Sequence, residues 1–168
     1  MTLKNPNLPY LSIHKVYWMG LQTFSDGTKI YSVDMMFAYI NIFNPPSSKM
    51  ELGRLTKSLE WKGWGDPAKK QYYSALDVIN NPTNKKYKDE IRRIKNANLR
   101  YPIIVHGTNI VDGVHRLTKA HLAEKKYIKC YEFSSALMKK FLLKGNWKKV
   151  DRLSTFDLIK IFYERFTP

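Results

Sequence analysis

The chain has 168 residues, of which 43% are hydrophobic, and it carries a formal net charge of +15. This length and apolar fraction are enough for one domain core, which excludes a disordered protein. The single cysteine, Cys130, excludes an internal disulfide and a cysteine-rich zinc site. The polar N-terminus does not resemble a signal peptide, so we expect an intracellular protein of the cytoplasm or nucleus.

The first 43 residues predict an arm, a hairpin and a helix. Residues 1–12 contain two prolines and are expected to form an extended arm. Residues 13–24 and 29–33 favour strands, and the Asp26-Gly27 pair between them is typical of a hairpin turn. Residues 34–43 predict a short helix that is far too short to span a bilayer.

The next segment predicts a helix with a leucine face. Residues 48–51, Ser-Lys-Met-Glu, match a capping box, so we expect a helix that continues to about Leu59. Leu52, Leu55 and Leu59 recur at helical spacing, which predicts that they are buried together.

Residues 61–97 predict a loop and two helices. Residues 61–67 carry two tryptophans and two glycines and are expected to form an irregular loop. Two interpretations of the tryptophans are open, because they can pin the loop to the core or stack on nucleic-acid bases. Residues 74–80 predict a brief helix capped by Ser74, and residues 85–97 a longer helix with an apolar stripe.

Residues 101–133 predict the centre of the fold. Residues 101–105 and 110–111 read as two short strands separated by a turn, and residues 127–133 as a third strand. A helix is expected over residues 116–124. We expect Ile103, Val105, Val111, Leu117 and Ile128 to be buried.

The last 35 residues, 134–168, predict a helical extension. Ser134 or Ser135 is expected to cap a helix that continues to about Leu143, and Ser154 to cap a final amphipathic helix through Phe166. Because the chain has no repeat or low-complexity linker, we expect a single domain over residues 1–168.

The motif Asp-Gly-Val-His-Arg, residues 112–116, falls where a strand is expected to end and a helix to begin. Glycine lets the backbone approach a ligand there, and the unpaired N–H groups of a helix start favour anions. His115 and Arg116 add two side-chain donors at the same place. The motif therefore predicts an anion site.

With its flanking strands and helix, this motif resembles the ParB/sulfiredoxin superfamily, including ParB-like domains and the free-serine kinases built on the same fold. The resemblance covers about a fifth of the chain. It implies an α+β fold and a nucleotide-phosphate site at Gly113, Val114, His115 and Arg116. We expect a small mixed sheet, formed from residues 13–33 and 101–133 together and packed by helices. Sulfiredoxins have a catalytic cysteine where this chain has Val114, so sulfinic acid reduction is not expected.

The resemblance implies further site residues. Basic residues near the first helix of sulfiredoxin-like folds hold phosphate, which makes Lys49 and Arg54 candidate ligands. The alternative is that both lie on a solvated face. ATP, ADP or CTP is the expected cofactor, and Mg²⁺ would assist phosphoryl transfer or phosphodiester hydrolysis. Asp112 and His115 are the candidate catalytic residues. The residues do not match a metal-binding pattern of histidines, so no protein-bound metal site is expected.

Simpler interpretations of the motif remain open. Asp112 can be an N-cap that accepts a hydrogen bond from the backbone of Val114 or His115. Gly113 can serve only to relieve a tight turn, and Arg116 can be a surface charge. The fold can also be retained without a ligand.

The positive charge is concentrated in two segments. Residues 85–100 hold seven basic and two acidic side chains, and residues 139–152 hold six basic and one acidic. Such clustering favours a polyanion, so the alternative function is a non-catalytic DNA- or RNA-binding protein. Its candidate ligands are Lys88, Arg92, Arg93, Lys95, Lys148 and Lys149. A lysine-rich surface is also typical of proteins from AT-rich genomes, viral ones included.

Overall fold

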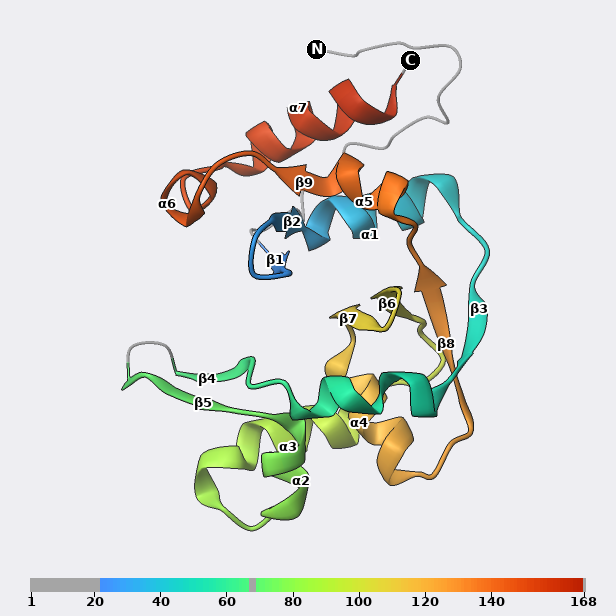
Figure 1. Ribbon diagram of the computed structural model, residues 1–168, viewed down its shortest axis with the longest axis vertical. Helices are drawn as coiled ribbons and strands as arrows, with labels where there is room; N and C mark the ends of the chain where they lie inside the picture. Colours follow the sequence, from blue (N-terminus) through green and yellow to red (C-terminus); the bar gives the residue numbers. More distant parts are fainter. Residues whose placement is uncertain (1–21, 67–68, 168) are drawn as a thin grey trace. The chain divides into compact units, whose positions relative to one another are not determined.

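The computed structural model describes residues 22–66 and 69–167 (Figure 1). They form two compact units, the first from residues 22–45 and 134–167 and the second from residues 46–66 and 69–133. Helices pack small sheets, which confirms the α+β class. The expected N-terminal arm and residues 13–21 of the first expected strand lie outside the described residues. That the whole chain is a single domain stays a prediction.

Unit 1 contains a small antiparallel sheet of order β1-β2-β9. The hairpin of β1 (Thr23–Ser25) and β2 (Ile30–Ser32) was expected, and β2 pairs further with β9 (Leu142–Leu143). Its helices are α1 (Val33–Phe43), α5 (Ser135–Phe141), α6 (Trp147–Val150) and α7 (Thr155–Phe166). No described helix of the chain is both long enough and apolar enough to cross a membrane.

The hairpin turn of unit 1 is closed by Asp26. Its carboxylate accepts hydrogen bonds from the backbone N–H groups of Thr28 and Lys29 and from the hydroxyls of Thr28 and Tyr31. The two backbone bonds favour the charged form most and lower the pKa of Asp26 to about 2. The Asp-Gly turn signal in the sequence therefore corresponds to a fully bonded turn.

Aromatic side chains from three helices of unit 1 pack together. Phe166 of α7 lies 5.3 Å from Tyr39 of α1 and 5.3 Å from Phe141 of α5, measured between ring centroids. Arg165 donates to the backbone carbonyls of Lys140 and Leu142, at the end of α5. These hydrogen bonds and the aromatic contacts hold α7 against α1, α5 and the start of β9.

Unit 2 is built on a mixed sheet of order β3-β8-β6-β7. The central pair, β6 and β8, is parallel, and both outer pairs are antiparallel. The strands are β3 (Ser48–Glu51), β6 (Ile103–His106), β7 (Asn109–Asp112) and β8 (Tyr127–Glu132). The remaining elements are the 3₁₀ helices η2 (Leu52–Glu60) and η4 (Lys85–Tyr87), the hairpin of β4 (Trp64–Asp66) and β5 (Gln71–Tyr73), and the helices α2 (Ala75–Asn80), α3 (Lys88–Asn96) and α4 (Val114–Leu122).

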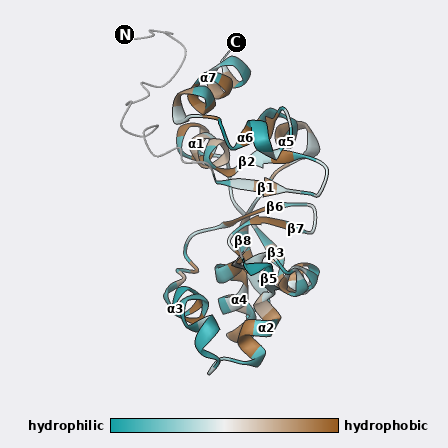
Figure 2. Ribbon diagram, turned by 90° about the vertical axis from the view of Figure 1, so that its left-hand side faces the viewer, coloured by the Kyte–Doolittle hydropathy of each residue, from teal (hydrophilic) through white to brown (hydrophobic). Residues whose placement is uncertain are grey.

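The core of unit 2 lies between the sheet and the helices η2 and α4. Figure 2 shows β6 and β7 in the colour of hydrophobic residues. The residues expected in the core are all buried, namely Ile103, Val105, Val111, Leu117 and Ile128. The three leucines of η2 are buried too, and Cys130 is buried between strands as a free thiol. The apolar patterns thus predicted the core.

Three local expectations are wrong. Residues 48–51 do not cap a helix, because Met50 and its neighbours pair with β8 and the helix begins only at Leu52. Residues 61–67 are not simply an irregular loop, since Trp64 starts a hairpin strand. The N-terminal hairpin does not join the mixed sheet. Its partner is β9, at the place where the helix was expected to continue to Leu143.

Candidate functional site

The turn between β7 and α4 depends on a glycine. Gly113 occupies the N-cap position of α4 with φ +103°, a left-handed conformation that other residues rarely adopt. A Cβ atom at this position would lie 2.5 Å from Cγ2 of Ile103 and 2.8 Å from Nη2 of Arg116. Asp112 precedes the cap position, so the interpretation of Asp112 as the N-cap is wrong.

Asp112 and Arg116 form an ion pair across this turn. Nη2 of Arg116 lies 2.6 Å from Oδ2 of Asp112, and their side chains are only 22% and 18% exposed. The Nε–H of Arg116 is buried and has no hydrogen-bond partner among the described residues. The simpler interpretation of Arg116 as a surface charge is therefore wrong. Its guanidinium group lies folded against Gly113.

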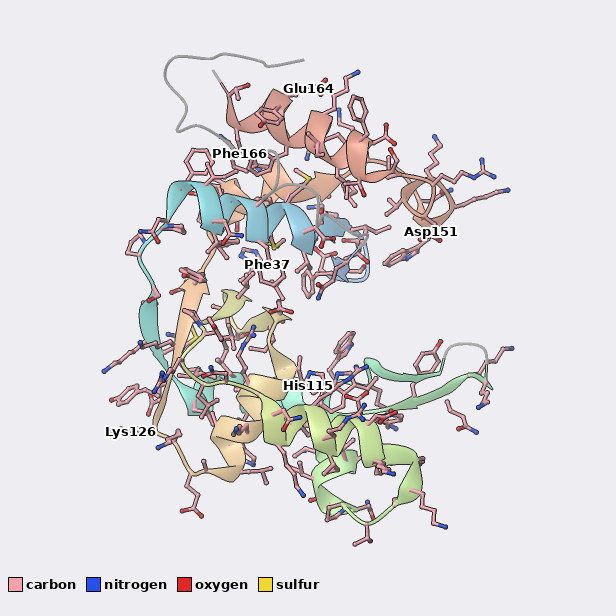
Figure 3. All side chains as sticks on the ribbon, turned by 180° about the vertical axis from the view of Figure 1, so that it is seen from behind. Phe37, His115, Lys126, Asp151, Glu164 and Phe166 are labelled. Atoms are coloured by element: carbon pink, nitrogen blue, oxygen red, sulfur yellow. The ribbon has the colours of Figure 1, made fainter. Side chains whose placement is uncertain are left out.

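His115, labelled in Figure 3, is held by two side chains from earlier in the sequence. Its Nε2 lies 2.6 Å from Oε2 of Glu90 on α3. The indole of Trp64 on β4 stacks on its ring, with centroids 4.6 Å apart and planes inclined by 14°. A carboxylate bound to one ring nitrogen fixes the orientation of the imidazole, as it does for many catalytic and metal-binding histidines.

Lys119 joins α3 to α4. Its Nζ donates to the backbone carbonyls of Lys95 and Ala97, each at 2.7 Å. Both carbonyls lie at the C-terminal end of α3, where the helix dipole is negative and a cation is stabilising. Together with the contact between Glu90 and His115, these bonds hold the end of α3 next to the motif.

A pocket of about 350 Å³ lies between α3 and the turn. From α3 it is lined by Arg92, Arg93 and Asn96, and from the turn by Asp112, His115 and Arg116. Three arginines and one aspartate are therefore among the residues that line this space. Arg93 is also 3.7 Å from Glu90, so part of its charge is compensated. The pocket suits an anion with several acceptor oxygens.

The structure brings only some of the expected site residues together. Gly113, His115 and Arg116 line the pocket, whereas Val114 packs its side chain against the core. Lys49 lies on β3, at the opposite edge of the sheet from β7, and is not part of the pocket lining. Lys148 and Lys149 belong to α6 in unit 1.

Three contributors to the site were not foreseen from the sequence. Glu90 was given no role and Trp64 was expected in a loop, because each meets His115 only through the tertiary fold. Asn96 likewise gave no signal. No group of three or more histidine, cysteine, aspartate or glutamate side chains within residues 22–66 and 69–167 could hold a metal ion.

Comparison with known proteins gives no relative: no family model, curated protein or solved structure matches the chain.

Proposed function

We propose that unit 2 binds a nucleotide through a phosphate group at the start of α4, as the resemblance of residues 112–116 to ParB/sulfiredoxin proteins suggests. The observation that carries this proposal is the glycine cap. With Gly113 at the N-cap position, no cap side chain covers the helix start. The N–H groups of the first turn therefore remain to be satisfied by water or by an anion.

The charges around the pocket support the same proposal. Arg92, Arg93 and Arg116 line the pocket, and guanidinium groups match phosphate oxygens in geometry as well as in charge. The buried Nε–H of Arg116 has no hydrogen-bond partner in the part of the chain that the structure describes. This adds a reason for a ligand, because an unsatisfied buried donor costs about 1–3 kcal/mol. A phosphate that draws the guanidinium away from Gly113 would relieve this cost.

The first test is ligand binding. A nucleotide that binds only the folded protein raises the melting temperature, so we expect ATP, ADP, CTP or GTP, with and without Mg²⁺, to produce such a shift. Arg116→Ala is expected to weaken nucleotide binding by about 1.5–3 kcal/mol, the range for a hydrogen bond to a charged group. Lys125→Ala, after the C-terminal end of α4, removes the same charge from an exposed position and should leave the affinity unchanged.

Stability must be measured beside affinity for this variant. Because Arg116 is mostly buried and paired with Asp112, its removal takes an ion-pair partner from a partly buried carboxylate and is expected to cost about 1–3 kcal/mol of folding free energy. Titrations are therefore performed well below the melting temperature of each variant. Equal nucleotide affinity of Arg116→Ala and the parent would refute the phosphate site.

A separate experiment tests whether Asp112 takes part in catalysis. The proposal gives Asp112 the role of orienting a hydroxyl or a metal-bound water for phosphoryl transfer or phosphodiester hydrolysis. Asp112→Asn retains an acceptor for Arg116 but cannot act as a base. We expect this variant to bind nucleotide and to lose turnover. Parent-like turnover would remove Asp112 from the mechanism, while the binding proposal would stand.

A further inference from the structure

The outer face of α3 and the preceding 3₁₀ turn carry a stripe of basic side chains. Lys85, Lys88, Arg92 and Lys95 are all exposed, and their spacing of three, four and three residues places them along one face of the helix. Lys88 to Lys95 covers about 10 Å along the axis at about 1.5 Å per residue. The stripe is therefore long enough to meet more than one phosphate.

These four side chains line one surface pocket. It has a volume of about 400 Å³, and Asn84 and Asn96 add amide groups to its wall. Neither a carboxylate nor an aromatic ring belongs to its lining. Such a surface offers donors to phosphate and sugar oxygens but no platform for a base. Arg92 and Asn96 also line the pocket at the start of α4, so the two pockets adjoin across α3.

Helix α3 contacts the rest of unit 2 through its other faces, which leaves the basic stripe exposed. Tyr87 and Ile94 bury the opposite side of this segment in a small core with Val78. Glu90 points to His115, and Lys119 covers the negative end of the helix. Asp89 does pair with Arg92 at 3.1 Å, but both side chains are about 70% exposed, so water and salt screen this pair strongly.

A nucleic-acid strand fits this surface better than a membrane does. Membrane-surface helices insert large apolar side chains beside their basic face. The exposed large hydrophobic residues of unit 2, among them Trp61, Tyr72 and Tyr101, lie outside α3. A free nucleotide would occupy one phosphate position, whereas a stripe of four cations matches the repeated charge of a phosphodiester chain.

We infer that Lys85, Lys88, Arg92 and Lys95 bind the sugar-phosphate backbone of a nucleic-acid strand without reading its sequence. This surface shares Arg92 with the proposed phosphate site at α4, but Lys85, Lys88 and Lys95 do not line that pocket, and the surface needs neither Gly113 nor Arg116.

The test uses the full chain with all four residues replaced by glutamine, and a matched control with Arg54, Lys57, Lys125 and Lys129 replaced instead. Both variants lower the net charge by four from exposed positions of unit 2. Binding to a fluorescent single-stranded oligodeoxynucleotide of mixed sequence, and to its duplex, is followed by anisotropy from about 50 to about 200 mM salt. Vesicles of phosphatidylcholine with phosphatidylserine test the membrane.

For the stripe variant we expect at least a tenfold loss of affinity at low salt, roughly the effect of losing several phosphate contacts. The slope of log K against log salt should fall by about 2–3, since each contact to a single strand contributes about 0.7. The control should lose less than about threefold. Circular dichroism confirms that each variant is folded, and the double variant Lys88→Gln/Lys95→Gln gives the same comparison with fewer changes.

Any of three results would overturn the inference. The first is that the parent binds no nucleic acid at low salt. The second is that the control loses as much affinity as the stripe variant, and the third is that the parent binds the vesicles but no oligonucleotide. The double variant Lys88→Gln/Lys95→Gln keeps every residue that lines the α4 pocket. Its nucleotide affinity, measured in parallel, therefore distinguishes failure here from failure of the α4 site.

Discussion

The start of α7 in unit 1 and the start of α4 in unit 2 are closed in different ways. At α7, Oγ of Ser154 accepts from the backbone of Asp157, and the carboxylate of Asp157 accepts from the backbone and hydroxyl of Ser154. At α4, the cap position is Gly113, which has no side chain. One helix start is capped by the side chains of its own residues, and the other has no side-chain cap.

This difference sets α4 apart from most helices of the chain. Side chains of serine or asparagine cap α1, α2, α5 and α6, just as Ser154 caps α7. Capping stabilises a helix by about 0.5–2 kcal/mol. Helix α3 also lacks a side-chain cap, but it continues directly from the 3₁₀ helix η4, so the missing cap at α4 needs another reason. The glycine at α4 supplies a turn that only glycine tolerates, and the same turn exposes the backbone to the pocket.

The largest expected effect comes from Gly113→Ala. The left-handed conformation costs about 1–2 kcal/mol for alanine, and overpacking against Ile103 and Arg116 about 1–3 kcal/mol more. We expect a total loss of about 2–5 kcal/mol in urea denaturation. Gly107→Ala is the matched control and should lose only the conformational part, since Gly107 has φ +61° and a Cβ atom there would meet no other atom within 4 Å. Equal losses in the two variants would mean that close packing at the motif is unimportant.

Ser154→Ala tests the closed helix start. It removes the acceptor for the backbone of Asp157 and should cost about 1 kcal/mol of stability, while Ser154→Asn keeps an acceptor and should cost less. Nucleotide should stabilise Ser154→Ala and the parent by the same increment. If nucleotide stabilised Ser154→Ala and the parent by different amounts, the ligand would not bind at the α4 start alone.

Glu90→Gln tests how the motif is supported in place of a cap. The amide still accepts from Nε2 of His115, but the bond is no longer assisted by charge, so we expect a loss of about 0.5–1.5 kcal/mol. Asp89→Asn makes the same charge change one residue away, in an exposed pair with Arg92, and should remain within about 0.5 kcal/mol of the parent. If both variants are as stable as the parent, Glu90 does not hold His115.

The smallest effect concerns pH. The hydrogen bonds from the side chain and backbone of Ser154 lower the pKa of Asp157 from 3.8. A lowered pKa means that this stabilisation is present above about pH 4 and disappears as the pH falls through the folded-state pKa. The difference in melting temperature between the parent and Asp157→Asn should therefore shrink on acidification below about pH 4. A difference that stays constant to low pH would contradict the charged cap.

The sequence predicted elements whose signals are local. The Asp-Gly turn, the capping serines at positions 74, 134 and 154 and the buried spacing of Leu52, Leu55 and Leu59 all describe neighbours along the chain, and they are confirmed. Burial of the leucines survived even though the helix around them begins later and is 3₁₀.

The sequence did not predict the features that depend on contacts between residues far apart along the chain. Residues 48–51 satisfy a capping pattern, but the backbone bonds with β8 prevail over it. Nothing local in β9 indicated a strand, because its two residues gain that conformation by pairing with β2. In the candidate site, the motif itself was found, whereas Glu90 and Trp64 reach His115 across 25 and 51 positions of sequence.

Cys130 makes unit 2 accessible to a kinetic experiment. It is the only thiol of the chain, it is fully buried on β8 between β3 and β6, and it lies 3.3 Å from the hydroxyl of Ser48. An alkylating reagent can reach it only when these strands separate. The labelling rate of the native protein therefore reports openings that expose β8 of unit 2. A ligand that binds only the closed unit slows this rate in proportion to the fraction of protein left without ligand.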